Sequence, residues 1–162
     1  MDKATFGAGC FWGVEAAFRM RKGIVGTVAG YTGGYVDSPT YSQVCGGRTG
    51  HVEALQITFD QKKISYERLL EIFWQIHDPT LENRQGNDVG PQYQAVIFYH
   101  NEAQRIAAEK SKEDLEKSGT YDEAIVTQIR PLDKFYPAEE EHQRYLEKHP
   151  GGYCHIDLKS IH

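Results

Sequence analysis

Patterns typical of strands alternate with patterns typical of helices along nearly all of the 162 residues, and this alternation limits the folds open to the chain. Short apolar runs at 24–29, 95–99 and 124–129 predict strands. Ser65 is placed to cap an apolar-faced helix, and Asn101 opens a long polar helix that Gly119 closes. We expect an α/β fold: one domain over 1–162, a two-layer sandwich with a mixed sheet and a ferredoxin-like core.

Residues 5–9 lead into a run whose apolar positions, Phe11, Val14 and Phe18, share one face of a helix. Cys10 therefore stands at a helix N-terminus, where backbone N–H groups favour a thiolate and lower the thiol pKa. Glycines before and after Cys10 allow close backbone approach. The glycines within 30–35 predict a turn after the strand at 24–29.

The strand predicted at 52–59 has two possible inward faces. One is formed by Val52, Ala54 and Gln56. The other, more apolar, set includes Leu55 and carries Glu53 inward, where burial would perturb its carboxyl group. Glu53 is thus a candidate for proton chemistry.

Two further segments bear on function. Residues 79–91 form a long loop with almost no periodicity, which is more often functional than idle in a compact domain. The charge polarity of 139–149 predicts a short helix, stopped by Pro150 and two glycines. These glycines predict a mobile C-terminal tail from about residue 150 that carries Cys154.

Composition excludes several classes of partner. The formal net charge of −5 gives no basic footprint for nucleic acid or anionic lipid. No stretch is long and apolar enough for a membrane span or a secretory signal. Three widely spaced cysteines fit neither a disulfide framework nor a zinc site, which favours a reduced compartment with reactive thiols. We expect a cytoplasmic monomer with no bound metal or cofactor.

The run Gly-Cys-Phe-Trp-Gly-Val-Glu at 9–15 resembles the signature of the peptide methionine sulfoxide reductase A family. Further segments resemble the family in its own order over nearly the whole chain, from residue 5 to residue 154. These segments are 30–34, 39–41, 49–53, 77–79, 84–90 and 92–93.

The resemblance implies an enzyme that reduces the S epimer of methionine sulfoxide, free or in proteins. Cys10 would attack the sulfoxide sulfur and become a sulfenic acid, and Glu53 would supply a proton to the oxygen. Tyr41 and Tyr93 would hydrogen-bond that oxygen. The residues implied to hold the rest of the substrate are Phe11 and Trp12 at its methyl group and Asp88 at its backbone.

The chemistry supports separate roles for Cys10 and Glu53, because expelling a sulfoxide oxygen requires its protonation. An anionic Cys10 would supply the nucleophile and a neutral Glu53 the proton. Because the two groups would interact, any measured pKa would belong to the Cys10–Glu53 pair. The sulfenic acid is then removed by a second thiol. The resemblance assigns this role to Cys154, and treats Cys45 as structural.

Some family members carry a further recycling cysteine, which this chain lacks after Cys154. A Cys10–Cys154 disulfide would then itself be the bond reduced by thioredoxin.

Other interpretations are open to the same residues. A cysteine hydrolase would pair Cys10 with His51 or His77. A redox-sensing or sulfoxide-binding module would use the Cys10–Cys154 bond as a switch without turnover. Dinucleotide binding is rejected because a bulky Trp12 occupies the position of the third glycine, and a zinc deaminase because its cysteine pair is missing.

Overall fold

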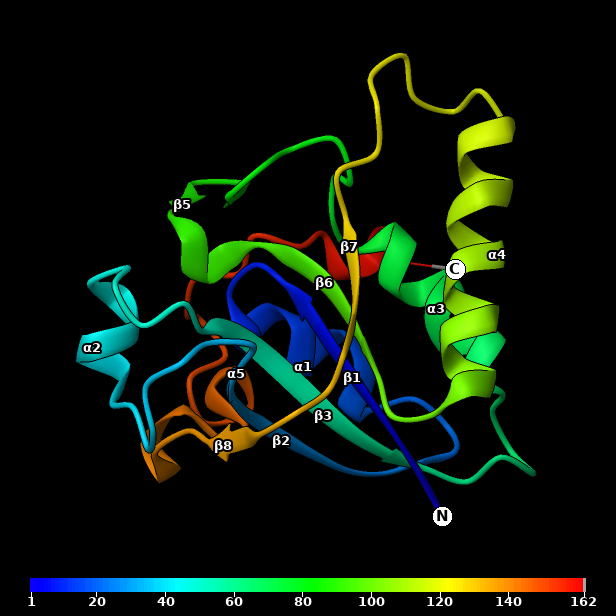
Figure 1. The fold of residues 1–162 in the computed structure, drawn as a ribbon. Helices are drawn as coiled ribbons and strands as arrows, with labels where there is room; N and C mark the ends of the chain where they lie inside the picture. Colours follow the sequence, from blue (N-terminus) through cyan, green and yellow to red (C-terminus); the bar gives the residue numbers. More distant parts are fainter. Residues whose placement is uncertain (162) are drawn as a thin grey trace.

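A curled six-stranded sheet forms the centre of the computed structural model, which describes residues 1–161 (Figure 1). The strands lie in the order β7-β6-β1-β3-β2-β8, and only the β6–β7 pair is parallel. Their bounds are β1 Asp2–Ala8, β2 Ile24–Thr32, β3 Val52–Phe59, β6 Ala95–Tyr99, β7 Gln128–Pro131 and β8 Phe135–Pro137. The expected mixed α/β fold is therefore present.

Helices pack mainly on one face of this sheet. They are α1 Phe11–Arg19, α2 Tyr41–Cys45, α3 Tyr66–Gln75, α4 Glu102–Lys117 and α5 Tyr145–Lys148, with short 3-10 turns at Pro91–Tyr93, Glu140–His142 and Leu158–Ser160. Side chains of β1, β3, α1 and α3 form the main core, in which Phe6 stacks on Phe18 and Phe73. Burying each such ring contributes about 1.5–3 kcal/mol.

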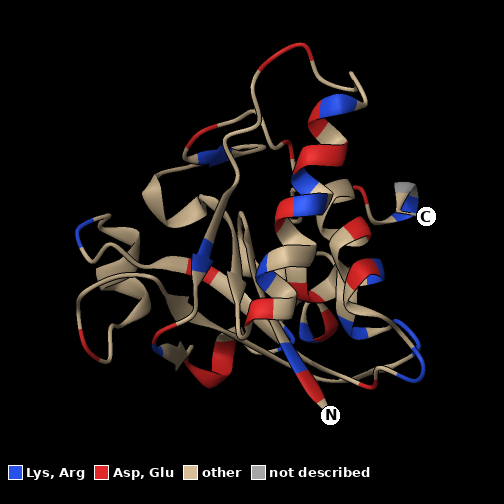
Figure 2. Ribbon diagram, turned by 45° about the vertical axis from the view of Figure 1, so that its right-hand side comes forward, with Lys and Arg blue, Asp and Glu red and all other residues tan. Residues whose placement is uncertain are grey.

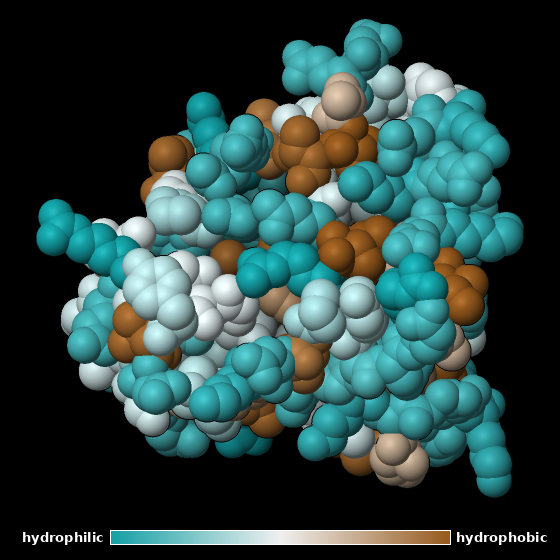
Figure 3. Space-filling view, viewed as in Figure 1, coloured by the Kyte–Doolittle hydropathy of each residue, from teal (hydrophilic) through white to brown (hydrophobic). Residues whose placement is uncertain are grey.

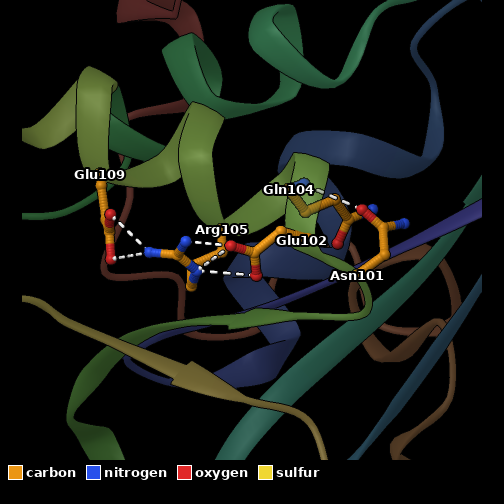
Figure 4. A network of polar contacts seen from close by, with 5 residues as sticks. All are labelled: Asn101, Glu102, Gln104, Arg105 and Glu109. Atoms are coloured by element: carbon orange, nitrogen blue, oxygen red, sulfur yellow. Dashed lines mark hydrogen bonds and ion pairs between the residues drawn. The ribbon is translucent and has the colours of Figure 1, made fainter.

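Two helix starts follow the prediction from sequence. The Ser65 hydroxyl accepts a hydrogen bond from the backbone N–H of Arg68, and the Asn101 side chain accepts one from Gln104. In α4, Arg105 pairs with carboxylates on either side of it, Glu102 and Glu109 (Figure 4). Acidic and basic residues alternate along this exposed helix (Figure 2). On the face seen in Figure 3, hydrophobic patches are small and separated by polar side chains.

The turn predicted from the glycines within 30–35 is only partly present. Strand β2 runs on to Thr32, and Gly30 lies within it; a methyl group there would lie 2.5 Å from the Tyr136 carbonyl and the Phe135 ring. Gly30 thus permits the close approach of β8, and the turn begins only at Gly33, with φ +88°. Because β8 pairs only with the second half of β2, the first half is largely exposed despite its apolar residues.

Other boundaries also differ. The last predicted strand begins at Gln128 instead of Ala124, because only the segment from Gln128 pairs with β6. The predicted helix over 139–149 is broken at Arg144, whose left-handed φ of +52° separates a 3-10 turn from α5. The loop at 79–91 contains a small hairpin of β4 Arg84–Gln85 and β5 Asp88–Val89.

Candidate active site

Cys10 lies where the central strand β1 turns into α1, as the sequence predicts. Gly9 adopts φ +90°, a conformation that favours glycine, and a methyl group there would lie 2.8 Å from both Gln85 Cβ and His155 Nε2. Cys10 itself is the N-cap of α1 and is only 7% exposed. The junction thus holds the sulfur at a helix start, inside the protein.

The pKa of Cys10 differs from the expectation. Burial raises it well above its usual range, and the charge of Glu53 raises it further. The backbone N–H groups of Trp12 and Gly13 act in the opposite direction, as a helix N-terminus should, but their effect is smaller. The resting site therefore holds a thiol, because desolvation outweighs the helix terminus.

Glu53 is buried on the face of β3 that carries Leu55 into the main core, as the more apolar of the two predicted faces requires. Val52 and Ala54 are also buried, in a smaller cluster on the opposite face, so this end of the strand is covered on both sides. Its Oε1 accepts a hydrogen bond of 3.1 Å from the Phe11 N–H, while Oε2 is buried and has no hydrogen-bond partner within residues 1–161. Burial, partly opposed by the Phe11 N–H, raises the pKa of Glu53 to about 8. A carboxyl group of this kind is largely protonated at neutral pH and has an oxygen available to a ligand.

Aromatic rings surround the start of α1. Phe11 is fully buried and packs against Tyr41, with ring centres 6.4 Å apart. Trp12 is partly exposed and stacks on Tyr145 at 3.8 Å, and its Nε1–H donates to His142 Nδ1. The rings of His142 and Tyr41 lie 4.2 Å apart. Together the rings of Phe11, Trp12, Tyr41, His142 and Tyr145 form an aromatic wall beside Cys10.

The two tyrosines singled out from sequence come from separate segments. Tyr41 opens α2, and Tyr93 ends the 3-10 turn that follows the 79–91 loop. Both pack against the cluster that contains Cys10. Burial raises the pKa of both tyrosines; a hydrogen bond from the Tyr41 hydroxyl to Cys45 raises that of Tyr41 further, and the charge of Glu53 raises both. Both hydroxyls therefore keep their protons.

Asp88 and Cys154 come together through the C-terminal segment. Asp88, on β5, lies with its Oδ2 3.8 Å from His155 Nδ1, and burial raises its pKa. Cys154 is half-buried, and a methyl group on Gly13 would lie 3.1 Å from its Sγ. Cys154 is thus packed on the first turn of α1. Cys45 is exposed at the end of α2, and all three cysteines are free thiols.

The histidines of the hydrolase hypothesis have other partners. His51 contacts the Gly34 N–H and the Val36 carbonyl, and His77 contacts the Phe73 carbonyl and the Thr127 hydroxyl. Both ring nitrogens of each are therefore engaged away from Cys10. Over the described chain, no group of three or more His, Cys, Asp or Glu side chains is placed to hold a metal ion. No described helix has both the length and the apolar character of a membrane span.

Sequence reasoning missed three polar residues at the site. Glu139 accepts hydrogen bonds from the Tyr31 hydroxyl, at 2.9 Å, and from the Tyr41 N–H, at 3.0 Å. His142 lies within the aromatic wall, and His155 donates through Nε2 to the Ala8 carbonyl at 2.9 Å. No local sequence pattern predicts these three residues, because each contacts a segment more than 90 positions away in the chain.

Comparisons with known proteins agree with this geometry. The family model described as peptide methionine sulfoxide reductase matches residues 2–162. The peptide methionine sulfoxide reductase MsrA of Methanosarcina acetivorans is 59% identical over 148 residues, which cover 91% of this chain and 79% of that protein. Reduced Mxr1 of Saccharomyces cerevisiae has a TM-score of 0.90 at 38% identity, covering 99% of this chain and 91% of that one.

A second structure of the yeast protein records a partner. Mxr1 in complex with Trx2 matches with a TM-score of 0.62 at 27% identity, covering 89% of this chain and 84% of that one.

Proposed function

The chain belongs to the peptide methionine sulfoxide reductase family and reduces methionine sulfoxide, and we propose that Cys10 and Glu53 carry out the chemical step. The observation that carries this proposal is the free, buried Oε2 of Glu53, on a carboxyl group whose pKa is about 8, beside a buried thiol. A neutral acid next to a nucleophile is what removal of a sulfoxide oxygen requires.

In the proposed step the Cys10 sulfur attacks the sulfoxide sulfur. The thiol first loses its proton to solvent, and neutral Glu53 gives its own proton to the sulfoxide oxygen. The oxygen ends on Cys10 as a sulfenic acid, the sulfur–oxygen bond of the substrate breaks, and methionine leaves. Glu53 is left as a carboxylate and takes up a proton from solvent, which balances the proton that the thiol lost.

The surrounding residues would orient the substrate. The Tyr41 and Tyr93 hydroxyls, both protonated, are suited to hydrogen-bond the sulfoxide oxygen, and Phe11 and Trp12 offer an apolar surface for the methyl group. Asp88 would accept the backbone N–H of a substrate. Because the methyl group and the oxygen are recognised by different walls, only one epimer fits both, and we propose that it is the S epimer.

The pH dependence of the first step follows from the proton count. The reacting pair, a Cys10 thiolate with a neutral Glu53, holds one proton, whereas the resting pair at neutral pH holds two, since the pKa of Glu53 is about 8 and that of Cys10 is higher. At limiting sulfoxide, the second-order rate of methionine release is expected to rise up to tenfold per pH unit and to level off near pH 8. Single-turnover assays across this range measure it.

The Glu53→Gln variant tests whether titration of Glu53 causes the rate of methionine release to level off near pH 8. In that variant only the thiol titrates, so its much lower rate should keep rising beyond pH 8. A wild-type rate that is flat from about pH 6 to about pH 8 would contradict the proposed protonation states.

Turnover requires removal of the sulfenic acid, and we propose Cys154 as the resolving thiol and thioredoxin as the external reductant. Support comes from the packing of Cys154 on the first turn of α1 and from the yeast relative solved with Trx2. No cofactor is needed, because the electrons come from the two thiols.

Cys154→Ser separates the two steps. The variant is expected to release about one methionine per enzyme at the wild-type rate and then to stall with thioredoxin, because no disulfide can form. Counting methionine against enzyme, with Cys45→Ser as a control that continues to turn over, measures this. Normal turnover of Cys154→Ser with thioredoxin would remove the resolving role.

We further infer a ferredoxin-like core, supported by the antiparallel order β6-β1-β3-β2 with α1 and α3 packed on one face. A cytoplasmic location is proposed because all three thiols are free. A monomer without nucleic-acid or membrane partners is proposed from the net charge and from the scattered apolar side chains on the face shown in Figure 3.

A further inference from the structure

The side chain of His155 fills a hollow made by three glycines at the active site. Methyl groups added to Gly9, Gly13 and Gly86 would lie 2.8 Å, 3.2 Å and 3.1 Å from atoms of His155. The side chain is 2% exposed. The tail that carries Cys154 is therefore docked by a buried histidine across the start of α1.

A hydrogen bond fixes the orientation of this ring. His155 Nε2 lies 2.9 Å from the carbonyl oxygen of Ala8, two residues before Cys10. A carbonyl oxygen can only accept, so Nε2 carries a proton. The ring is thus tied to the strand end that leads into the nucleophile.

The other ring nitrogen links the tail to the loop expected to hold the substrate. Nδ1 and the Oδ2 of Asp88 are 3.8 Å apart, and neither has a hydrogen-bond partner among residues 1–161. Burial lowers the pKa of His155 and raises that of Asp88, which disfavours an imidazolium–carboxylate pair at this contact. The Tyr153 hydroxyl, which accepts from the Asn87 N–H, adds a second contact to the same loop.

Docking of His155 determines where the preceding residue lies. Cys154 is packed on Gly13, one turn along the helix from Cys10, and its thiol donates to the Ile156 carbonyl at 3.3 Å. We propose that His155 is the positioning residue of the resolving step: its hydrogen bond to Ala8 seats Cys154 beside the sulfenic acid. This inference rests on the resolving role proposed for Cys154.

The step itself needs no further reactant. The Cys154 sulfur bonds to the Cys10 sulfur as the sulfur–oxygen bond of the sulfenic acid breaks. The departing hydroxyl takes the proton of the Cys154 thiol and leaves as water. Its rate depends on how often the second sulfur lies within reach, and therefore on the docking of the tail.

Substitutions at His155 test this by separating the two steps. In His155→Ala, methionine release in a single turnover is expected to stay within about twofold of wild type, while Cys10–Cys154 disulfide formation slows about tenfold or more. His155→Gln, whose amide can donate to Ala8, should recover most of the loss. Quenched-flow sampling, with thiol alkylation and mass spectrometry, follows each product separately.

Leu158→Ala is the matched control, because Leu158 is exposed on the same tail. Its disulfide should form at the wild-type rate. An unchanged rate of disulfide formation in His155→Ala, an equal slowing in Leu158→Ala, or loss of methionine release in all His155 variants would overturn the positioning role. Absence of the Cys10–Cys154 disulfide in wild type would instead overturn the proposed function, and this inference with it.

Discussion

Replacing Cys10 with serine is expected to abolish methionine formation with dithiothreitol and with thioredoxin alike. Cys10 is the free thiol at the start of α1, beside the buried carboxyl group of Glu53. A serine hydroxyl ionises far less readily and cannot form a disulfide, so the loss should be on the order of 10⁴-fold or more, as for other deleted nucleophiles. Methionine released per enzyme in a single turnover is the measurement.

Folding must be excluded as the cause of that loss. Serine is close in size to cysteine, so Cys10→Ser should keep the circular dichroism spectrum and nearly the melting temperature of wild type. Cys45→Ser, a change of the same kind at an exposed position, should remain active. Activity in Cys10→Ser would eliminate the entire proposed mechanism.

The second large effect is expected in Glu53→Gln. Glutamine has the same shape and can still accept the Phe11 N–H, but it cannot deliver a proton from its second terminal atom. Methionine release should slow about 10²- to 10⁴-fold, the usual range for a lost general acid, while sulfoxide binding changes little. Single-turnover rates at saturating and at limiting sulfoxide separate these two effects.

Glu15→Gln provides a matched control. Glu15 is a second fully buried glutamate, on α1, and it accepts hydrogen bonds from the Thr27 hydroxyl and the Arg144 N–H. Its substitution should lower the free energy of unfolding by about 1–3 kcal/mol through a poorly satisfied contact, with a much smaller effect on the chemical step. Equal rates in Glu53→Gln and wild type would remove Glu53 as the acid.

Local patterns predicted part of this site. Periodicity places Cys10 at a helix start and Glu53 on an inward strand face, because both follow from the spacing of neighbouring apolar residues. The pKa of Cys10 could not be predicted in this way. It depends on how deeply the sulfur is buried and on the charge of a residue 43 positions away.

The remaining residues depend on tertiary folding. Tyr41, Asp88 and Tyr93 lie in elements of two to five residues, namely α2, β5 and the 3-10 turn at Pro91–Tyr93, and only the family resemblance singled them out. Gly30 does not form the predicted turn, because it lies in β2 where the backbone of the distant strand β8 approaches closely. His155 gave no local signal, since its three glycine neighbours come from two separate segments.

The aromatic wall has a consequence for synthesis of the protein on the ribosome. Trp12 donates a hydrogen bond to His142, which follows it by 130 positions in the chain, and it stacks on Tyr145 in the same C-terminal segment. A nascent chain that has emerged only as far as α4 already has Cys10, Phe11 and Glu53, but not the rings that complete the wall. Since such a contact forms only after distant parts of the chain meet, the pocket is assembled late. A ribosome-bound chain therefore has its nucleophile long before it can recognise an oxidised methionine.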